Sequence, residues 1–273
     1  MSTLSGKTLF ITGASRGIGL AIGLRAARDG ANVVIAAKSS VPHPKLPGTI
    51  HSAAEAIEAA GGRALPLKLD IRDDQAVAEA MAQAAGHFGG IDILVNNASA
   101  IWLAGIEDTP IKRFDLMQQV NARGSFVCAQ AALPYLKQAG NPHILTLAPP
   151  PNLDPKWWGP HTAYTLAKMG MSFVTLGLAA ELGPKGIGVH ALWPRTVIAT
   201  AALAMLGDAA RPEHCRKPEI MADAAHVLLC RPAASCNGGF RIDEDVLREE
   251  GVQDFSAFAV EPGQPLLPDL FLD

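Results

Sequence analysis

Short runs of β-branched and aliphatic residues alternate with alanine-rich stretches of helical period, and this alternation constrains the fold more than any other feature. It begins with KTLFIT, IGLAIGLRAARDG, ANVVIAA, TIHSAAEAIEAAG and RALPLKLD, and it continues to GIGVHALWP. Strands joined through helices pair in parallel, with right-handed crossovers. We expect six such strands, with GGFRID as a seventh, and long helices over residues 113–138 and 164–182. The pattern predicts an α/β protein with a doubly wound, parallel seven-stranded sheet flanked by helices.

The length suits one large domain. The chain has 273 residues, of which 49% are hydrophobic and 18% charged, enough to bury a sizeable core. We place a single nucleotide-binding domain at residues 1–250, without internal repeats. Residues 251–273 are rich in proline and carry several phenylalanines and leucines, so we expect an extended tail that packs on the same domain or on a neighbouring subunit.

Charge and cysteine content narrow the functional class. A formal net charge of −3 provides no basic field for nucleic acid, although a small anionic ligand is compatible with it. The four cysteines lack the paired short spacing of a zinc site and are too few for a disulfide framework, so we predict no metal and a reducing cytoplasm. No apolar run reaches the roughly 18 residues that span a bilayer, and the N-terminus lacks a signal-peptide core. We expect a soluble, unprocessed protein.

A glycine-rich loop follows the first predicted strand in FITGASRGIG. Glycine lets the backbone approach a pyrophosphate, and the N-terminus of the following helix offers free N–H groups and a partial positive charge. The alternative is a tight strand-to-helix turn without a ligand. The position in a βαβ unit favours a dinucleotide site formed by Gly13, Ser15, Arg16, Gly17, Ile18 and Gly19.

The second predicted strand ends in a cation. An NAD site places an acid roughly 20 residues past the glycine loop, against the ribose 2′-hydroxyl, but the chain has Lys38 and Ser39 there. Arg16 adds a guanidinium suited to a pair of phosphate oxygens. The alternative is that Lys38 only ends a strand in solvent. The two cations together favour NADP, with NAD as the less favoured cofactor.

A Tyr-x-x-x-Lys pair occurs in AYTLAK. On a helix, Tyr164 and Lys168 lie on one face, where a neighbouring ammonium lowers the pKa of the phenol and lets it exchange a proton with a substrate oxygen. The alternative is a half-buried tyrosine beside a surface lysine. The glycine loop upstream favours the catalytic interpretation.

These motifs together resemble the short-chain dehydrogenase/reductase family. TGASRGIG, NNAS, QQVNARG and YTLAK occur in the family's order and approximate spacing, and the resemblance covers almost the whole chain. It implies a Rossmann domain, an NAD(P)-dependent interconversion of C=O and CH–OH groups, and a homo-oligomer, dimer or tetramer, assembled through the two long helices.

The resemblance also assigns residues. It implies that Lys168 holds the nicotinamide ribose, that Asn121 supports a water relay to it and that Asp70 contacts the adenine. Asn97 and Ala98 would fix the strand end beside the cofactor, although both Asn97 and Asp70 could equally serve as loop hydrogen bonders. Near the nicotinamide the family has Pro-Gly, whereas this chain has Pro194-Arg195-Thr196. Val197 and Thr200 stay expected neighbours of the cofactor.

The chain departs from the family at a serine. Most members have one just past the fifth strand, where it donates a hydrogen bond to the substrate oxygen, but this chain has Pro149, Pro150 and Pro151. Proline lacks even a backbone N–H, and such a donor is worth about 3 kcal/mol in a transition state. We expect Asn152 to replace it, with His161 or Thr162 as alternatives. Asn152 could instead cap the proline turn, and Tyr164 could suffice alone.

The substrate should be hydrophobic. If Trp102, Trp157 and Trp158 faced the cleft, with Leu203 and Met205 as a lid, the pocket would be large and apolar. The alternative for each side chain is packing in the core or between subunits. Two functions stay open: an NADP-dependent oxidoreductase acting on a lipid-like carbonyl or alcohol, and a cofactor-binding sensor or scaffold with little turnover, in which the prolines mark lost catalysis.

Overall fold

Seven parallel strands form one sheet in the order β3-β2-β1-β4-β5-β6-β7, as the alternating pattern predicts. The computed structural model describes residues 3–44, 46–205 and 211–273, and the backbone alone at 204 and 205. The strands are β1 (Thr8–Thr12), β2 (Asn32–Ala37), β3 (Arg63–Lys68), β4 (Ile93–Asn96), β5 (His143–Thr146), β6 (Gly188–Trp193) and β7 (Phe240–Ile242). The five inner strands are buried along their whole length, as expected for a sheet covered on both faces. Pro66 lies in β3, which is an edge strand and tolerates a missing N–H.

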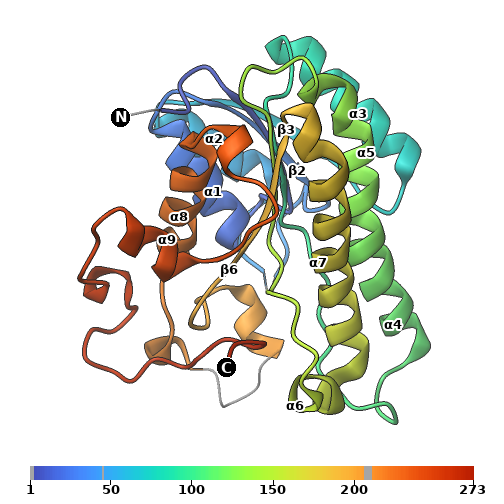
Figure 1. Ribbon diagram of the computed structural model, residues 1–273, viewed down its shortest axis with the longest axis vertical. Coiled ribbons are helices and arrows are strands. Elements are labelled where there is room, and N and C mark those ends of the chain that lie inside the picture. Colours follow the sequence, from blue (N-terminus) through green and yellow to red (C-terminus); the bar gives the residue numbers. More distant parts are fainter. Residues whose placement is uncertain (1–2, 45, 206–210) are drawn as a thin grey trace.

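The helices cover both faces of the sheet (Figure 1). They are α1 (Gly17–Ala27), α2 (Ile50–Ala59), α3 (Asp74–Phe88), α4 (Ile111–Gln118), α5 (Gly124–Leu136), α6 (Pro155–Trp158), α7 (Thr162–Leu182), α8 (Glu219–Cys230) and α9 (Asp243–Glu249). One hydrophobic cluster joins α1, α2, α8 and α9 to alternate strand residues, and a second joins α3, α5 and α7 to the others. This is the doubly wound Rossmann arrangement that the sequence predicts. Within the described residues, no helix is both long and apolar enough to cross a membrane.

The predicted long helix over 113–138 is interrupted. A π-helical segment, Gln119–Arg123, separates α4 from α5. The Ser125 hydroxyl donates to the Asn121 carbonyl at 2.7 Å, and the Asn121 side chain is fully buried. A single inserted residue leaves helical periodicity almost unchanged, which explains why the sequence pattern predicts one continuous helix. Such segments often occur at functional sites.

The C-terminal tail packs against the segment that follows β6. Val197 donates its backbone N–H to the Leu267 carbonyl at 2.9 Å, and Asp269 donates to the Arg195 carbonyl at 3.1 Å. The Trp193 indole N–H donates to the Leu270 carbonyl at 2.9 Å. The chain thereby returns from α9 to the end of the sheet where β6 stops, and it ends close to α6 (Figure 1).

Candidate active site

A cavity of about 490 Å³ lies at the carboxyl ends of the parallel strands. The strand order reverses between β1 and β4, and the loops after these two strands form part of its wall. Ligands of open α/β sheets bind in the crevice at such a reversal point. Residues that follow a strand closely contribute to the wall from six strands, namely Gly13, Lys38, Asp70, Asn97, Leu147 and Pro194.

Two glycines of the loop, Gly13 and Gly19, leave no room for a side chain. Gly13 has a φ of +69°, and a Cβ there would lie 2.9 Å from Asn97 Nδ2. A Cβ at Gly19 would lie 2.5 Å from the same atom. Asn97 Nδ2 donates to the Thr12 carbonyl at 2.8 Å and to the Gly13 carbonyl at 3.2 Å, so it joins the end of β1 to the end of β4. Gly19 serves this close packing and does not line the cavity, whereas Gly13 does.

The first turn of α1 is open to an anion. Arg16 precedes the helix, no side chain caps it, and its first turn contains no acidic residue. Ser15, Gly17 and Ile18 line the cavity at this point. The free N–H groups of an uncapped helix N-terminus and its partial positive charge suit a phosphate. The glycine cradle and this donor set therefore fit the pyrophosphate of a dinucleotide.

Cationic groups gather where β2 ends. The Arg16 guanidinium donates to the Ser39 hydroxyl at 2.9 Å and to the carbonyls of Pro47 and Gly48 at 2.7 and 2.9 Å. Lys38 Nζ lies 3.7 Å from Asp70 Oδ2. The hydrogen-bonded Arg72 guanidinium, with a smaller contribution from Lys38, lowers the pKa of Asp70 to about 2. Arg16, Lys38, Ser39 and Asp70 all line the cavity.

Tyr164 and Lys168 lie in the same cavity wall, one turn apart on α7. The tyrosine is 6% exposed, and its hydroxyl has no hydrogen-bond partner among the described residues. Lys168 Nζ donates to the Leu147 carbonyl at 2.6 Å and lies 4.8 Å from the centre of the Trp193 ring. Burial lowers the pKa of this lysine to about 7.

The expectation that Lys168 lowers the pKa of Tyr164 is not met in this structure. Burial raises that pKa, and the nearby Asp269 raises it further. Burial is the larger cause, and no opposing effect of Lys168, whose Nζ donates to the Leu147 carbonyl, offsets it. The phenol is therefore neutral and carries a proton that it can donate.

Asn121 acts through the backbone of the loop after β4. Its Oδ1 accepts from the Ala100 N–H at 2.7 Å, and its Nδ2 donates to the Ala100 carbonyl at 3.0 Å. Ala100 lines the cavity, whereas Asn121 does not. The π-helical segment thus places a buried carboxamide that fixes one wall of the site.

The proline segment, residues 149–153, follows β5 and provides no hydrogen-bond donor to the cavity, since none of its residues lines it. Asn152, predicted as the replacement, donates to the Phe271 carbonyl at 3.2 Å and to Asp273 at 3.1 Å, so its amide holds the C-terminal tail and does not line the cavity. The alternatives are also engaged elsewhere. His161 Nδ1 lies 3.2 Å from the Thr165 hydroxyl, and the Thr162 hydroxyl donates to the Trp158 carbonyl at 2.8 Å. Neither residue lines the cavity.

The structure thus brings together most of the predicted site. All predicted cofactor residues except Gly19 line the cavity, including Ala98, Pro194, Val197 and Thr200, whereas the predicted catalytic residues Asn121 and Asn152 do not. Arg195 turns away, since its guanidinium pairs with Asp245 at 2.6 Å. Residues that sequence reasoning did not assign to the site also line it, and these are chiefly Trp193, Asp269 and Leu270. The only sequence signal for Asp269 and Leu270 was their place in PDLFLD, the apolar last segment of the proline-rich tail.

The predicted tryptophan pocket is not formed. The cavity wall does not include Trp102, Trp157 or Trp158, which pack in a cluster beside it. The Trp158 indole N–H donates to the Asn152 carbonyl at 3.0 Å, and that of Trp102 donates to the Asp108 carbonyl at 3.3 Å. Of the predicted lid, Leu203 lines the cavity, and the side chain of Met205 lies outside the described part of the chain.

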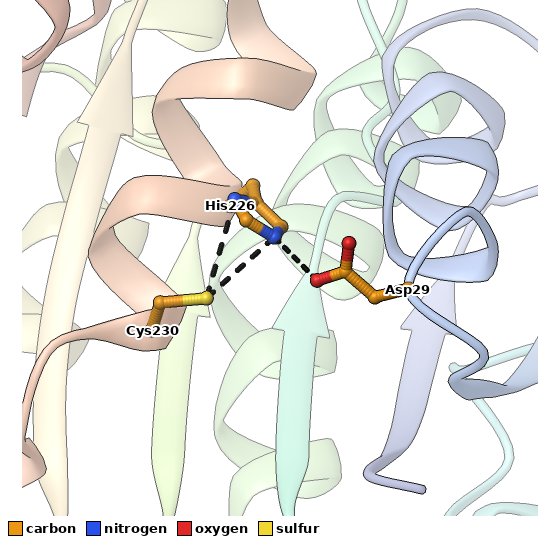
Figure 2. A group of neighbouring side chains, drawn as sticks. All are labelled: Asp29, His226 and Cys230. Atoms are coloured by element: carbon orange, nitrogen blue, oxygen red, sulfur yellow. Dashed lines mark hydrogen bonds and ion pairs between the residues drawn. The ribbon is translucent and has the colours of Figure 1, made fainter. Parts of the chain in front are cut away.

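The described residues also include a group with metal-ligand chemistry, away from the cavity. Figure 2 shows Asp29 beside His226 and Cys230, with Asp29 Oδ2 2.7 Å from His226 Nε2 and Cys230 Sγ 3.6 Å from that nitrogen. Asp29 also accepts from the Leu4 N–H at 2.9 Å and pairs with Arg25 at 3.2 Å, and burial raises the pKa of the Cys230 thiol to about 11. An occupied carboxylate, a nearby guanidinium and a disfavoured thiolate oppose a cation. We interpret the group as a hydrogen-bonded link between the turn after α1 and α8.

Comparison with known proteins agrees with this geometry. Residues 7–210 match the family model of the short chain dehydrogenases. Hydroxysteroid dehydrogenase-like protein 2 from Danio rerio is 58% identical over 270 residues, which is 99% of this chain and 65% of that protein. The human protein of the same name is 56% identical over 271 residues, covering 99% of this chain and 64% of its own length. The chain thus spans a little under two thirds of these relatives.

Solved structures give the same assignment. A dehydrogenase from Xanthomonas campestris is 70% identical with a TM-score of 0.97, covering 99% of both chains. A short chain dehydrogenase from Mycobacterium thermoresistibile is 53% identical with a TM-score of 0.93, covering 99% of this chain and 96% of its own.

More distant structures contain cofactors of both kinds. A gluconate 5-dehydrogenase from Beutenbergia cavernae with bound NADP is 27% identical, has a TM-score of 0.75 and covers 88% of this chain and 96% of its own. A carveol dehydrogenase from Mycobacterium avium in complex with NAD, 19% identical with a TM-score of 0.75, shares the fold over 89% of this chain and 97% of its own. The chain belongs to the short-chain dehydrogenase/reductase family of NAD(P)-dependent oxidoreductases.

Proposed function

We propose that this protein is an NADP-dependent oxidoreductase that interconverts a hydrophobic, lipid-like carbonyl compound and its alcohol. The observation that carries the proposal is that the glycine loop, the cationic end of β2 and the Tyr164–Lys168 pair all line one cavity. Bound NADPH supplies the hydride that reduces the carbonyl carbon. Gly13, Ser15, Gly17 and Ile18 would hold its pyrophosphate and Lys168 its ribose.

The proton comes from Tyr164. The residue lines the cavity, its hydroxyl is unpartnered within the described structure, and its raised pKa keeps it a neutral phenol. A neutral phenol donates a proton to the carbonyl oxygen as negative charge develops there, and accepts one in the reverse direction only after deprotonation. We propose that Asn121 supports the site by fixing Ala100, whose backbone it holds on both sides.

The preference for NADP is supported by charge. Arg16, Lys38 and Ser39 offer a guanidinium, an ammonium and a hydroxyl where an NAD site would present a carboxylate. Asp70 lies next to Lys38, but its ion pair with Arg72 neutralises it. We therefore propose that the two cations bind the 2′-phosphate, with the Asp70 loop beside the adenine.

The hydrophobic substrate is supported by the cavity wall. Its large apolar side chains include Ile101, Leu116, Val120, Trp193, Leu203 and Leu270. Side chains of this kind make a pocket favourable for an aliphatic chain, with polar groups only where the reacting carbon lies.

NADPH oxidation by the purified protein, with medium- and long-chain aldehydes and ketones, tests the proposal. Tyr164→Phe should abolish turnover, whereas Tyr135→Phe, at the only other tyrosine of the chain, should leave it unchanged. Tight NADPH binding without turnover of any panel member would instead favour a cofactor-binding sensor or scaffold. Equal turnover by Tyr164→Phe and wild type would contradict the assignment of the proton donor.

We further propose a homo-oligomer, located in the cytoplasm. Large apolar side chains lie exposed on α5 and α7, namely Phe126 (48%), Leu166 (41%), Phe173 (48%) and Leu176 (51%). The two helices contact each other, so these side chains belong to one surface that a second copy of the chain would cover. The location rests on four cysteines that are all free thiols, as in a reducing compartment.

A further inference from the structure

The catalytic end of the cavity has few groups able to donate to a substrate oxygen. Pro149–Pro151 supply no N–H, Lys168 Nζ donates to the Leu147 carbonyl, and Asn152 holds the tail. Tyr164 is the proton donor of the proposed reaction. A second donor, if present, has to come from another part of the wall.

The C-terminal tail brings a carboxyl group to this point. Asp269 lines the cavity together with Tyr164 and Lys168. Its Oδ1 accepts from the Leu270 N–H at 2.7 Å, and its Oδ2 has no hydrogen-bond partner within the described part of the chain. One carboxyl oxygen is therefore held by the backbone while the other is free to bind a ligand.

The backbone around this residue is fixed on both sides. Asp269 donates its N–H to the Arg195 carbonyl at 3.1 Å, and the Leu270 carbonyl accepts from the Trp193 indole at 2.9 Å. Phe271 is 1% exposed. Asn152 holds the Phe271 carbonyl at 3.2 Å, so the segment that lacks the serine helps to position the tail. A group held on this many sides is preorganised, as an effective transition-state donor must be.

The electrostatics favour a protonated carboxyl. Burial raises the pKa of Asp269 to about 7, the Leu270 N–H and the Lys168 ammonium lower it, and Asp243 raises it. Tyr164 and the Cys215 thiol are the other titratable groups that sense its charge. Near neutral pH a substantial fraction of Asp269 is therefore an O–H donor. A carboxylic acid kept neutral in an apolar site can stabilise a developing oxyanion.

We propose that Asp269, as the carboxylic acid, donates through Oδ2 the hydrogen bond to the substrate oxygen that a serine supplies in most of the family. This role rests on the proposed reductase function. During reduction, Tyr164 transfers its proton to the oxygen and Asp269 keeps its own. The C-terminal tail thus completes the active site.

Two substitutions of Asp269 test whether it acts as a hydrogen-bond donor or through its negative charge. Asp269→Asn keeps Oδ1 for the Leu270 N–H and places an amide N–H₂ group where Oδ2 lies, so it retains a donor and cannot ionise. Asp269→Ala removes the donor. At pH 6 we expect the asparagine variant to keep kcat within a few-fold of wild type and the alanine variant to lose about 100- to 1,000-fold. Equal losses in both would instead indicate a carboxylate acting through Lys168, and an active alanine variant would exclude any role; either result overturns the proposal.

The pH profile gives an independent readout. Wild-type kcat should fall as pH rises through the pKa of Asp269, whereas the amide donates at every pH. The ratio of kcat for Asp269→Asn to that of wild type should therefore increase from pH 6 to pH 9. A constant or falling ratio contradicts the proposal, because a purely structural role, or loss of the charge beside Lys168, cannot raise it.

A measurement without turnover distinguishes this inference from the proposed function. Infrared difference spectra between wild type and Asp269→Asn, both with bound NADP, should contain the carbonyl-stretch band of a protonated carboxylic acid at pH 6. Its absence overturns the role of Asp269 even if the enzyme reduces carbonyls. Its presence in a protein that turns over no substrate leaves the protonated acid established and contradicts the reductase function instead.

Discussion

The Phe271 ring lies beside the Tyr164 ring, with centroids 6.2 Å apart and planes inclined by 30°. Phe271 also approaches Trp157 and Trp193, at centroid distances of 5.9 and 6.0 Å. A residue near the end of the chain is thus part of the core behind the proposed proton donor. The tail is a structural component of the site, and its removal should affect both stability and chemistry.

Phe271→Ala should therefore destabilise the protein and impair turnover. The side chain is 1% exposed, and truncation of a buried phenylalanine costs about 3–5 kcal/mol in the free energy of unfolding. Denaturant unfolding followed by tryptophan fluorescence measures this change. Leu153→Ala is the control, since that side chain is 73% exposed and lies in the proline segment. An unfolding free energy equal to wild type would show that the tail does not pack as described.

Replacing Lys38 by aspartate should reverse the cofactor preference. The substitution removes a cation that we assign to the 2′-phosphate and places a carboxylate where an NAD site has one. A charged hydrogen bond is worth about 1.5–3 kcal/mol, so the NADPH dissociation constant should rise at least about tenfold while that of NADH falls. Fluorescence titration measures both constants. Lys185→Asp, at an exposed lysine that pairs with Glu181, is the control, and unchanged constants in Lys38→Asp would rule out our model of the phosphate site.

The residues that the sequence assigns to the cofactor, except Gly19, line one cavity because strand ends fix their positions. Gly13, Lys38, Asp70 and Asn97 each closely follow an apolar run, and the carboxyl ends of parallel strands meet at one edge. The substrate end depends on contacts that periodicity does not encode. Asp269 lies in a proline-rich segment without a repeat, and its burial arises only when the tail packs on Trp193. The partners of Asn152 lie in that same tail, so its role could not be read from neighbouring residues.

Asp243→Asn should make the protein less sensitive to pH between 4 and 7. Asp243 is fully buried; its Oδ1 accepts from the Arg195 and Glu244 N–H groups at 2.9 and 2.7 Å, whereas Oδ2 is buried without a partner in the described structure. Burial raises the pKa from 3.8 to about 6. A raised pKa means that ionisation of Asp243 disfavours the folded state. The stability contributed by the protonated carboxyl is therefore fully present below 3.8, its pKa in the unfolded chain, and is lost as pH rises through 6.

Asparagine keeps the Oδ1 acceptor and cannot ionise. The unfolding free energy of Asp243→Asn minus that of wild type should therefore increase by up to about 3 kcal/mol between pH 4 and pH 7. Any constant cost of burying the amide cancels in this pH dependence. Denaturant titrations at a series of pH values give the difference, with the exposed Asp108→Asn as the control. A difference that does not vary with pH would contradict a buried, ionising Asp243.

The apolar surface on α5 and α7 should hold the oligomer together. Phe173 and Leu176 are 48% and 51% exposed and lie three positions apart on α7, hence on one side of the helix. A charge on this surface would be buried without a partner if a second copy covered it, which costs several kcal/mol. The double variant Phe173→Asp, Leu176→Asp should therefore elute as a monomer in size-exclusion chromatography with light scattering, whereas wild type forms a dimer or tetramer. Leu153→Asp, at an exposed position on neither helix, should retain the wild-type mass. A monomeric wild type, or a double variant with the wild-type mass, would show that this surface does not join the subunits.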